Sequence, residues 1–442
     1  MGPALPSIVI RAFVSSAPLR DRLEPAVTTT ELPKCPMDPT RDDRKSAALA
    51  AQRVRADAGA RVVGSFDFGR AILRSATMLQ AGAGSEQVKV GGDEHGPVFF
   101  LDGEEHRRRR TAIARFFTPK AISTRHRLVM ERTSDELLAR LRAKGSGQLD
   151  ELSYQLAVAV AAEIVGLTDS NQVAMARRIQ ATLLGTRLRG MHPVIRVGAQ
   201  ALTAVHAMRF FLRDVRPAIR SRRRERRDDV ISHLIDEGYP DKAILIECMT
   251  YAVAGMVTTR EFIVMVAWHL FDDDELRARF AAGDEADQTA IIEEILRLEP
   301  VAAMLHRRAT QDSDLGVGSV KEGELLAVSI RAANVDPETV GECPHALDPD
   351  RARRLKAVGS YMSFGDGSHR CPGAQVAINE TRVFLDRLMR LPDLRLARTP
   401  DMTWCDGLMS YELRGATVTC SRDLTPAAHG TGQDAGPDGE RT

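Results

Sequence analysis

The sequence lacks several features that define large classes of proteins. Its 442 residues carry a formal net charge of +1, whereas a nucleic-acid-binding protein usually has a strong basic excess. No run of about 20 apolar residues is present, so no segment is expected to span a membrane. The first residues, "MGPALPSIVIRAFVSS", lack the charged start and long apolar centre of a signal peptide. We therefore expect a cytoplasmic protein with neither a nucleic-acid partner nor a membrane partner.

Closely spaced cysteine pairs are also missing. The six cysteines lie far apart, and none of them forms a CxxC pair. The spacing argues against a structural zinc site. It also argues against a disulfide framework, because small disulfide-stapled domains carry dense cysteines. We expect free thiols in a reducing compartment.

The chain is long enough for a large hydrophobic core, since 43% of its residues are apolar. Helical periodicity dominates, and a minor share of strand is expected late in the chain. The longest helix is predicted to begin near Asp241 and to pass Phe271. It is apolar nearly all round and should be buried. We expect a loosely ordered arm over 1–40, a single domain over 41–420 and a disordered tail over 421–442. Helices are predicted at 104–117, 121–143, 151–165, 171–184, 194–222, 287–298 and 374–391, a short strand in "ARVVGSFD", and a Gly-rich loop over 80–97.

The string "SFGDGSHRCPGAQVA", which runs from residue 363 to residue 377, places one cysteine in a glycine-rich turn. Gly365, Gly367 and Gly373 allow the backbone to turn tightly and to approach a flat ligand. Cys371 stands just before a predicted helix, whose N-terminus would stabilise a thiolate. A thiolate is a strong donor to haem iron. His369 and its neighbour Arg370 would bind an anionic group such as a propionate. A buried cysteine in an ordinary turn is the alternative.

The whole string resembles the haem-binding signature of the cytochrome P450 family, F-x-x-G-x-H/R-x-C-x-G. Phe364, Gly367, His369, Cys371 and Gly373 occupy every position of it. The resemblance extends over about 46–420. It implies a mainly α fold with a minor β part, a triangular helical prism in which a long central helix lies over a haem b. It also implies that Cys371 is the axial ligand of the haem iron.

A second element of the family, E-x-x-R on a helix, is supplied by "EEILRLEP". The spacing places Glu294 and Arg297 on one helix face, where they can form a salt bridge. The resemblance adds Arg351, in "LDPDR", as the third member of a buried triad. A buried charge group of this kind needs complete pairing, so the loss of one member should be costly.

Further basic residues resemble the contacts that the family makes with the haem propionates. These are His106 and Arg110, four residues apart, and Arg307 in "LHRRAT". His306 and Arg308 stand next to Arg307 and are alternatives to it. We predict that the remaining arginines of the first cluster lie on the surface and form, with Arg370, a positive patch for an acidic ferredoxin. They are Arg107, Arg108, Arg109 and Arg115.

The centre of the long helix reads "AGMVTT", where the family usually carries A/G-G-x-D/E-T-T/S. Ala254, Gly255 and Thr258 fit a pocket for dioxygen, although Thr258 could also bond its own helix carbonyl. Val257 replaces the usual acid, and Glu261 is a possible substitute one turn later. The substrate pocket is predicted to be apolar, with contributions from the 80–97 loop and 408–411. Its named members are Met256, Val257, Val301, Ala302, Met304, Leu305 and Met409.

The resemblance implies a monooxygenase that places one atom of O2 in an apolar or amphipathic small molecule. Electrons would come from NAD(P)H through a separate ferredoxin and ferredoxin reductase, since we see no flavin or iron–sulfur domain in the sequence. The valine at 257 keeps an alternative open, a haem-thiolate enzyme that is driven by peroxide or that couples or dehydrates its substrate. A third hypothesis is a haem-based sensor without turnover.

Overall fold

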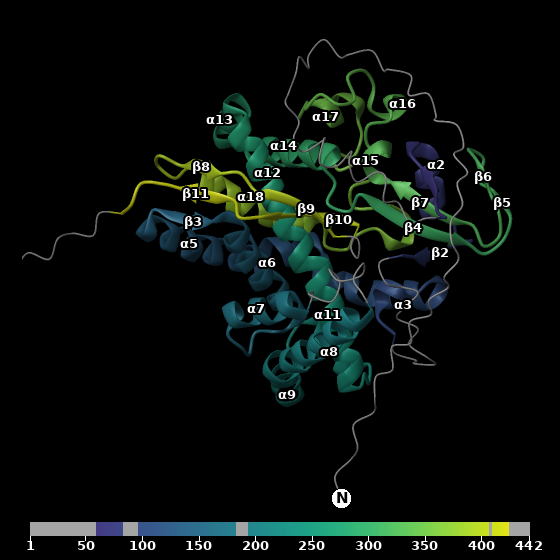
Figure 1. The fold of residues 1–442 in the computed structure, drawn as a ribbon, viewed down its shortest axis with the longest axis horizontal. Coiled ribbons are helices and arrows are strands. Elements are labelled where there is room, and N and C mark those ends of the chain that lie inside the picture. The colour runs from purple at the N-terminus through teal and green to yellow at the C-terminus, as the bar shows by residue number, and fades with distance from the viewer. Residues whose placement is uncertain (1–58, 83–95, 183–192, 406–408, 424–442) are drawn as a thin grey trace, which may run out of the picture.

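The computed structural model describes residues 59–82, 96–182, 193–405 and 409–423. Helices make up most of this part of the chain, and the strands are short (Figure 1). The α-helices are α2 (Phe66–Arg74), α3 (Gly103–Ala114), α4 (Pro119–Ala121), α5 (Arg127–Lys144), α6 (Leu149–Val165), α7 (Gln172–Thr182), α8 (Pro193–Phe210), α9 (Arg216–Arg224), α10 (Val230–Asp236), α11 (Asp241–Tyr251), α12 (Thr258–Asp272), α13 (Asp274–Ala282), α14 (Glu285–Leu298), α15 (Ile330–Ala333), α16 (Pro337–Val340), α17 (Arg351–Leu355) and α18 (Ala374–Met389). The mainly α architecture predicted from the sequence is confirmed.

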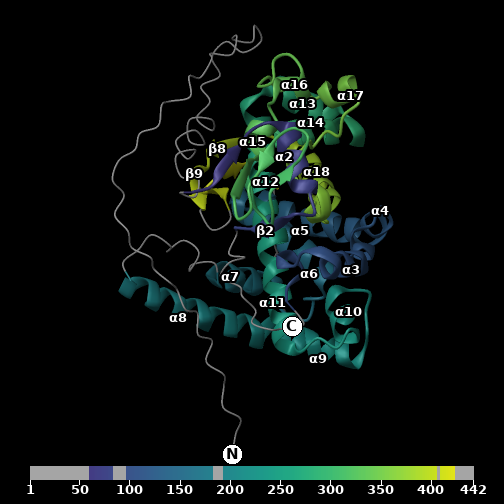
Figure 2. The same cartoon turned by 90° about the vertical axis from the view of Figure 1, so that its right-hand side faces the viewer.

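The predicted long helix is present as one rod of 32 residues, Asp241–Asp272, that passes through the middle of the molecule (Figures 1 and 2). Its centre is a π-helical segment, Ala252–Val257, which joins α11 to α12. Single π turns inside α-helices often mark functional sites. Among the described helices only this one has the length and apolar composition of a membrane span. Its α12 half is buried among α6, α14 and α18 as a core helix.

Four small sheets accompany the helices. The largest has the order β1-β7-β4-β2, from Arg61–Val63, Leu325–Ser329, Met304–Ala309 and Met78–Ala81; β1 runs parallel to β7, and the other pairs are antiparallel. A second sheet joins β3 (Ser146–Gln148), β11 (Thr417–Thr419) and β8 (Arg395–Arg398). Two hairpins complete the set, β9 (Asp401–Cys405) with β10 (Ser410–Arg414), and β5 (Ser313–Asp314) with β6 (Ser319–Val320).

The core is divided between two hydrophobic clusters. The larger one collects the inner faces of α5, α6, α12, α14 and α18. The smaller one lies between α2 and the four-stranded sheet, around Ile72, Leu326 and Met362. Met362 directly precedes the cysteine loop. The loop therefore begins at the seam between the sheet and the helical body.

Two sequence expectations about the chain need correction. Cys248, Cys371, Cys405 and Cys420 form no disulfide, as predicted, but Cys343 is disulfide-bonded. The tail was expected to begin at residue 421, yet Ser421 donates its N–H to the carbonyl of Pro392 at 3.0 Å. The predicted arm over 1–40 and most of the predicted 80–97 loop lie outside the described residues.

Candidate active site

The cysteine loop is fixed by its own backbone. Gly365 and Gly367 adopt φ angles of 71° and 68°, a region that favours glycine. A Cβ atom on Gly367 would lie 2.2 Å from the carbonyl oxygen of Leu73 in α2. The N–H of Cys371 donates to the carbonyl of Phe364 at 2.9 Å, which closes the loop on itself. These contacts set the position of the thiol before α18 begins.

The Cys371 thiol is in a mixed electrostatic environment. Burial raises its pKa, and the Gly373 N–H together with Arg110 and Arg370 opposes that shift. The sequence led us to expect a stabilised thiolate, but burial is the larger effect here. A bound metal cation would reverse this preference, because a coordinating thiol is deprotonated.

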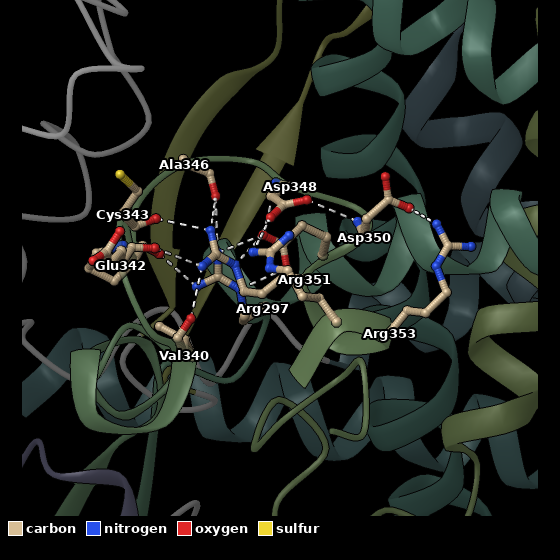
Figure 3. A network of polar contacts seen from close by, with 12 residues as sticks. Arg297, Val340, Glu342, Cys343, Ala346, Asp348, Asp350, Arg351 and Arg353 are labelled. Carbon is tan, nitrogen blue, oxygen red and sulfur yellow. Dashed lines mark hydrogen bonds and ion pairs between the residues drawn. The ribbon is translucent and has the colours of Figure 1, made fainter. Parts of the chain in front are cut away.

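The predicted triad is present as a buried ion-pair network (Figure 3). Both oxygens of Glu294 accept from Arg297, at 2.7 and 2.8 Å, and Arg351 reaches the same carboxylate at 3.2 Å. The side chains of these three residues are at most 3% exposed. The remaining guanidinium N–H groups donate to backbone carbonyls, so the buried charges are also hydrogen-bonded. These carbonyls belong to Asn334, Val340, Glu342, Cys343, Pro344 and Ala346.

Asn334 connects this network to the cysteine loop, a role that the sequence analysis missed. Its amide donates to the carbonyl of Arg297 at 3.1 Å and to the hydroxyl of Ser363 at 2.8 Å. Its side-chain oxygen accepts the N–H of Met362 at 2.9 Å. Ser363 in turn donates to the carbonyl of Leu296 at 2.9 Å. The entry to the cysteine loop is therefore hydrogen-bonded to α14 in two ways, directly through Ser363 and indirectly through Asn334.

The two predicted propionate ligands on α3 lie beside the cysteine loop. Arg110 donates to the carbonyl of Arg370. His106 stacks on His369 with ring centroids 4.0 Å apart and an angle of 15° between the planes. His369 also contacts Asp102 at 3.1 Å. Burial, together with the charges of His369 and Arg110, lowers the pKa of His106 to about 4. His106 is therefore a neutral hydrogen-bonding group at neutral pH.

Strand geometry favours Arg307 over its two neighbours as the third predicted propionate ligand. Successive side chains of a strand point to opposite faces, so Arg307 shares a face of β4 with Leu305. Leu305 is the side chain nearest to Gly365 of the cysteine loop. His306 instead packs on Gly82, and Arg308 donates to the carbonyl of Gly323. Burial lowers the pKa of Arg307 to about 10, so Arg307 remains a cation at neutral pH.

The π segment opens one face of the long helix. Ala254 is exposed, and Val253, Gly255 and Thr258 are half-buried, whereas Met256, Val257 and Thr259 are buried in the core. The Thr258 hydroxyl donates to the carbonyl of Ala254 at 2.6 Å, and Thr259 makes the same bond to Gly255, also at 2.6 Å. Thr259 is 5% exposed and faces the core. Of these two hydroxyls, Thr258 therefore lies on the open side.

The predicted lining of the substrate pocket needs correction at Met256 and Val257. Met256 and Val257 are 0% and 2% exposed and belong to the large hydrophobic cluster. Their side chains therefore do not line an open space. Glu261, the possible substitute for the missing acid, is also fully buried and accepts from Arg260 at 2.7 Å, from Arg414 at 2.8 Å and from the N–H of Leu413 at 2.7 Å. Both of its oxygens are occupied, so it acts as a structural anion.

The other predicted pocket residues form a short connected group. Val301 and Ala302 follow α14, and Met304 and Leu305 begin β4; all of them are apolar, and the last three are half-buried. Ala303 donates its N–H to the carbonyl of Met409 at 2.9 Å, which brings the two segments together. Met409 is 6% exposed and has a φ angle of 50°. Leu408 lies outside the described residues.

Not all of the arginines predicted for the surface are there. Arg109 is buried, pairs with Glu105 and donates to the carbonyl of Gly96 at 2.7 Å. Arg107 and Arg108 are exposed but pair with Glu104 and Glu105. Arg115 and Arg370 are exposed as predicted. The positive patch is therefore smaller than the sequence suggested.

The donor set fits a haem. A buried thiol, three basic groups able to receive propionates and a helix face without bulky side chains converge around the cysteine loop. Phe262 of α12 meets Phe364 of the loop edge to face, with ring centroids 6.4 Å apart. The long helix therefore passes beside the loop that carries Cys371, as a haem between them would require.

Comparisons with known proteins agree with this geometry. The family model described as "Cytochrome P450" matches residues 288–403, which include Glu294, Arg351 and Cys371. The biotin biosynthesis cytochrome P450 of Bacillus subtilis (strain 168) is 28% identical over 321 residues, 70% of this chain and 75% of that protein. The chain belongs to the cytochrome P450 family. It is accordingly a haem-thiolate monooxygenase, an oxidoreductase that uses haem iron and dioxygen.

Other P450 proteins support the same assignment. Nocardicin C N-oxygenase of Nocardia uniformis subsp. tsuyamanensis is 28% identical over 322 residues, 71% of this chain and 76% of that protein. The solved structure of P450BioI in complex with an acyl carrier protein that bears hexadec-9Z-enoic acid has a TM-score of 0.68 and 23% identity, and covers 85% of this chain and 98% of that one. An EryK mutant in complex with erythromycin B has a TM-score of 0.67 and 22% identity, with 87% and 99% covered. The P450 fold is thus established over most of the chain.

Proposed function

We propose that this P450 inserts one oxygen atom into an apolar or amphipathic small molecule, with Cys371 as the axial ligand. The fixed thiol of Cys371 beside the open face of the long helix is the observation that carries this proposal. His106, Arg110 and Arg307 would hold the propionates. When bound, the haem supplies the activation of dioxygen, and the protein supplies orientation and protons.

The apolar segment that follows α14 supports the substrate class. Val301, Ala302, Met304 and Leu305 offer no charged side chain to a ligand, and apolar walls with few polar groups are typical of small-molecule sites. Relatives are described with a fatty acyl chain and with erythromycin B, which are large and mainly apolar. For electrons we propose a separate ferredoxin and reductase fed by NAD(P)H, and for location the cytoplasm.

The first test concerns the axial ligand. In the Cys371→His variant we expect the Soret band of the reduced CO complex to lose its thiolate-type position, because imidazole replaces sulfur. Cys405→Ser, at a buried cysteine of β9 that forms no disulfide, is the matched control and should keep the thiolate-type band. A thiolate-type band that persists in the first variant contradicts the assignment.

A second candidate function rests on one observation. No acid stands at residue 257, and the carboxylate of Glu261 is occupied. An enzyme driven by hydrogen peroxide receives its protons with the oxidant, so it has less need of a relay. Turnover with peroxide, in the absence of NAD(P)H and redox partners, at a rate that matches the complete system would favour this candidate.

A further inference from the structure

A small pocket lies on the far side of α3 from the cysteine loop. It is large enough for about one water molecule, and it is bounded by α3, α10 and α11. On α3 the side chains of Arg108, Arg109 and Ala112 line this pocket. His106 and Arg110 of the same helix contact the cysteine loop instead. α3 therefore forms part of a wall between the pocket and the candidate haem site.

Glu247 of α11 lines this pocket and has an unusual environment. It is 3% exposed, and one of its oxygens accepts the N–H of Val98 at 2.9 Å. The other oxygen has no hydrogen-bond partner in the structure. A buried carboxylate with an unused oxygen is costly, so the pocket favours the protonated carboxyl or a water that bonds to it. Burial raises the pKa of Glu247 to about 7, and the Val98 N–H and Arg109 oppose this shift.

Tyr251 is the next pocket residue along α11 in the direction of the π segment. It follows Glu247 by four residues on α11, so the two side chains share one helix face, and both line the pocket. Tyr251 also interacts electrostatically with Arg110, which contacts the cysteine loop. The next residue begins the π segment that carries Ala254 and leads to Thr258. Burial holds the pKa of Tyr251 well above its usual value, so its hydroxyl keeps a proton to donate.

We propose that this pocket is a proton inlet, in which Glu247 takes protons from solvent and passes them through Tyr251 toward the open face of the long helix at Thr258. Each proton that leaves the carboxyl is replaced by water in the pocket, so Glu247 is unchanged after a turnover. This proposal rests on the function proposed above, because only an oxygen-reducing site consumes protons. It gives the chain an acid where Val257 and the occupied Glu261 supply none.

The groups around Glu247 allow this role. Arg109 opposes the rise in the Glu247 pKa, but its guanidinium also binds Glu105 and the Gly96 carbonyl. Ionised Glu247 therefore keeps a cation nearby without losing its ability to take up a proton near neutral pH. The titratable and charged groups that face the pocket or act on these two side chains are Arg108, Arg109, Arg110, Glu105, His233, Glu237, Tyr239 and Cys248.

The carboxyl itself can be tested by infrared spectroscopy without turnover. We expect a protonated-carboxyl C=O band that shifts in D2O, disappears with a midpoint near neutral pH and is absent from Glu247→Gln. The same substitution at Glu275, exposed on α13, is the matched control and should leave the band unchanged. If Glu247→Gln removes no band at any pH, Glu247 is not a proton-holding group and the proposal is wrong.

The route is tested in the complete system by product formed per NAD(P)H and by peroxide released. Tyr251→Phe and Glu247→Gln should each lower the coupling several-fold, and Glu247→Asp should restore part of it. In the wild type the coupling should fall as pH rises through the Glu247 pKa, because an ionised carboxylate has no proton to give; in Glu247→Gln it should not depend on pH in this range. A merely structural glutamate would not produce this difference.

The outcomes separate this proposal from the one it rests on. If Thr258→Ala uncouples the enzyme but Glu247→Gln does not, protons reach Thr258 by another path and the inlet is wrong. If the Glu247 variant uncouples and Thr258→Ala does not, the inlet stands and water replaces the threonine hydroxyl. If the Cys371→His variant keeps a thiolate-type CO band, the proposed axial ligand is wrong, whatever the infrared band shows.

Discussion

At the scale of single residues, two neighbouring threonines illustrate how identical local bonds can serve different purposes. Thr258 and Thr259 each donate to the carbonyl four residues earlier, at 2.6 Å. Such bonds are common for threonine in helices and alone indicate no function. Only Thr258 adjoins the open face, since Thr259 is 5% exposed in the core. Position, and not the hydrogen bond, separates the two.

We therefore predict opposite results for the two threonines. Thr258→Ala should divert electrons from product to peroxide while substrate binding changes little, because the hydroxyl nearest the open face is lost. Product formed per NAD(P)H consumed, measured together with peroxide, checks this. Thr259→Ala is the matched control and should stay coupled. Full coupling with reductant in both Thr258→Ala and Glu247→Gln would favour the peroxide-driven candidate.

A second residue-scale prediction concerns Glu380 of α18. Burial raises its pKa from 4.5 to about 8, and one of its oxygens has no partner in the structure. Because the folded-state pKa lies above the unfolded value, this group's stabilising contribution is complete below the unfolded pKa. It is lost as pH rises through the folded pKa. The wild-type protein should therefore lose stability between mildly acidic and mildly alkaline pH.

Glu380→Gln removes the ionisation and keeps the shape. Since one pKa unit corresponds to about 1.4 kcal/mol, the variant should be more stable than the wild type by about 2–4 kcal/mol near pH 8 and similar to it near pH 5. Urea unfolding at both pH values measures this. Glu380→Gln is compared with Glu275→Gln, whose site is exposed. An equal pH dependence in both variants would mean that Glu380 is not buried as described.

At the scale of elements, the cysteine loop depends on glycines for two separate reasons. Gly367 needs both its positive φ angle and the absence of a Cβ, which would meet a backbone carbonyl of α2. Gly316 has a similar φ of 79°, but a Cβ there would meet nothing within 4 Å. The two glycines therefore separate backbone strain from steric conflict.

Alanine at each glycine should show the difference. Gly316→Ala should lose about 1–2 kcal/mol of unfolding free energy, the cost of a left-handed backbone for an L-residue. Gly367→Ala should lose clearly more, and it should also weaken the thiolate-type CO band because the loop must move. Unfolding midpoints and CO spectra measure both effects. Equal losses in stability would contradict the claim that the close approach of α2 excludes a Cβ atom at residue 367.

The elements also show what the sequence could predict. Long apolar periodicity predicted α5, α6 and the α11–α12 rod correctly, because the spacing of apolar residues in the sequence matches the residues that these helices bury. Short helices such as α2, α10 and α13 were missed. The pairing of β11 with β3 was missed too, because a strand of three residues is defined by its partner, and this partner lies far along the chain.

The residues of the candidate site also fall into those that the sequence predicted and those that it missed. Cys371, Glu294 and Arg297 were found because they belong to spaced motifs. Asn334 and Glu247 were missed, since a single asparagine or glutamate carries no spacing signal and its role appears only in burial and hydrogen bonds. Met256 and Val257 were misplaced because residues between Ala254 and Thr258 in sequence point to the opposite side of the helix.

At the scale of the whole molecule, a nearly neutral protein still has a local charge pattern. The contact between Arg110 and the Arg370 carbonyl brings α3 to the cysteine loop. Exposed Arg115 and Arg370 therefore lie on one side of the molecule. Such a patch steers an acidic partner even when the net charge is +1.

We predict that electron transfer from an acidic ferredoxin slows as ionic strength rises, because salt screens exposed charges. Arg370→Glu should slow it several-fold at low salt, and the difference should shrink at high salt. Arg395→Glu is the control, because this exposed residue on β8 lies across the molecule from α3 (Figure 1). Stopped-flow reduction rates measure both. A wild-type rate that ignores ionic strength would count against this docking side.

The bonds of Asn334 have a consequence for the biogenesis of the protein. The hydrogen bonds through which Asn334 and Ser363 hold the entry to the cysteine loop all join residues between 294 and 363. The polypeptide can therefore shape this entry soon after that stretch leaves the ribosome. We therefore expect apoprotein made without haem to have this entry already formed and to bind haem added later, which the recovery of the thiolate-type CO band would measure.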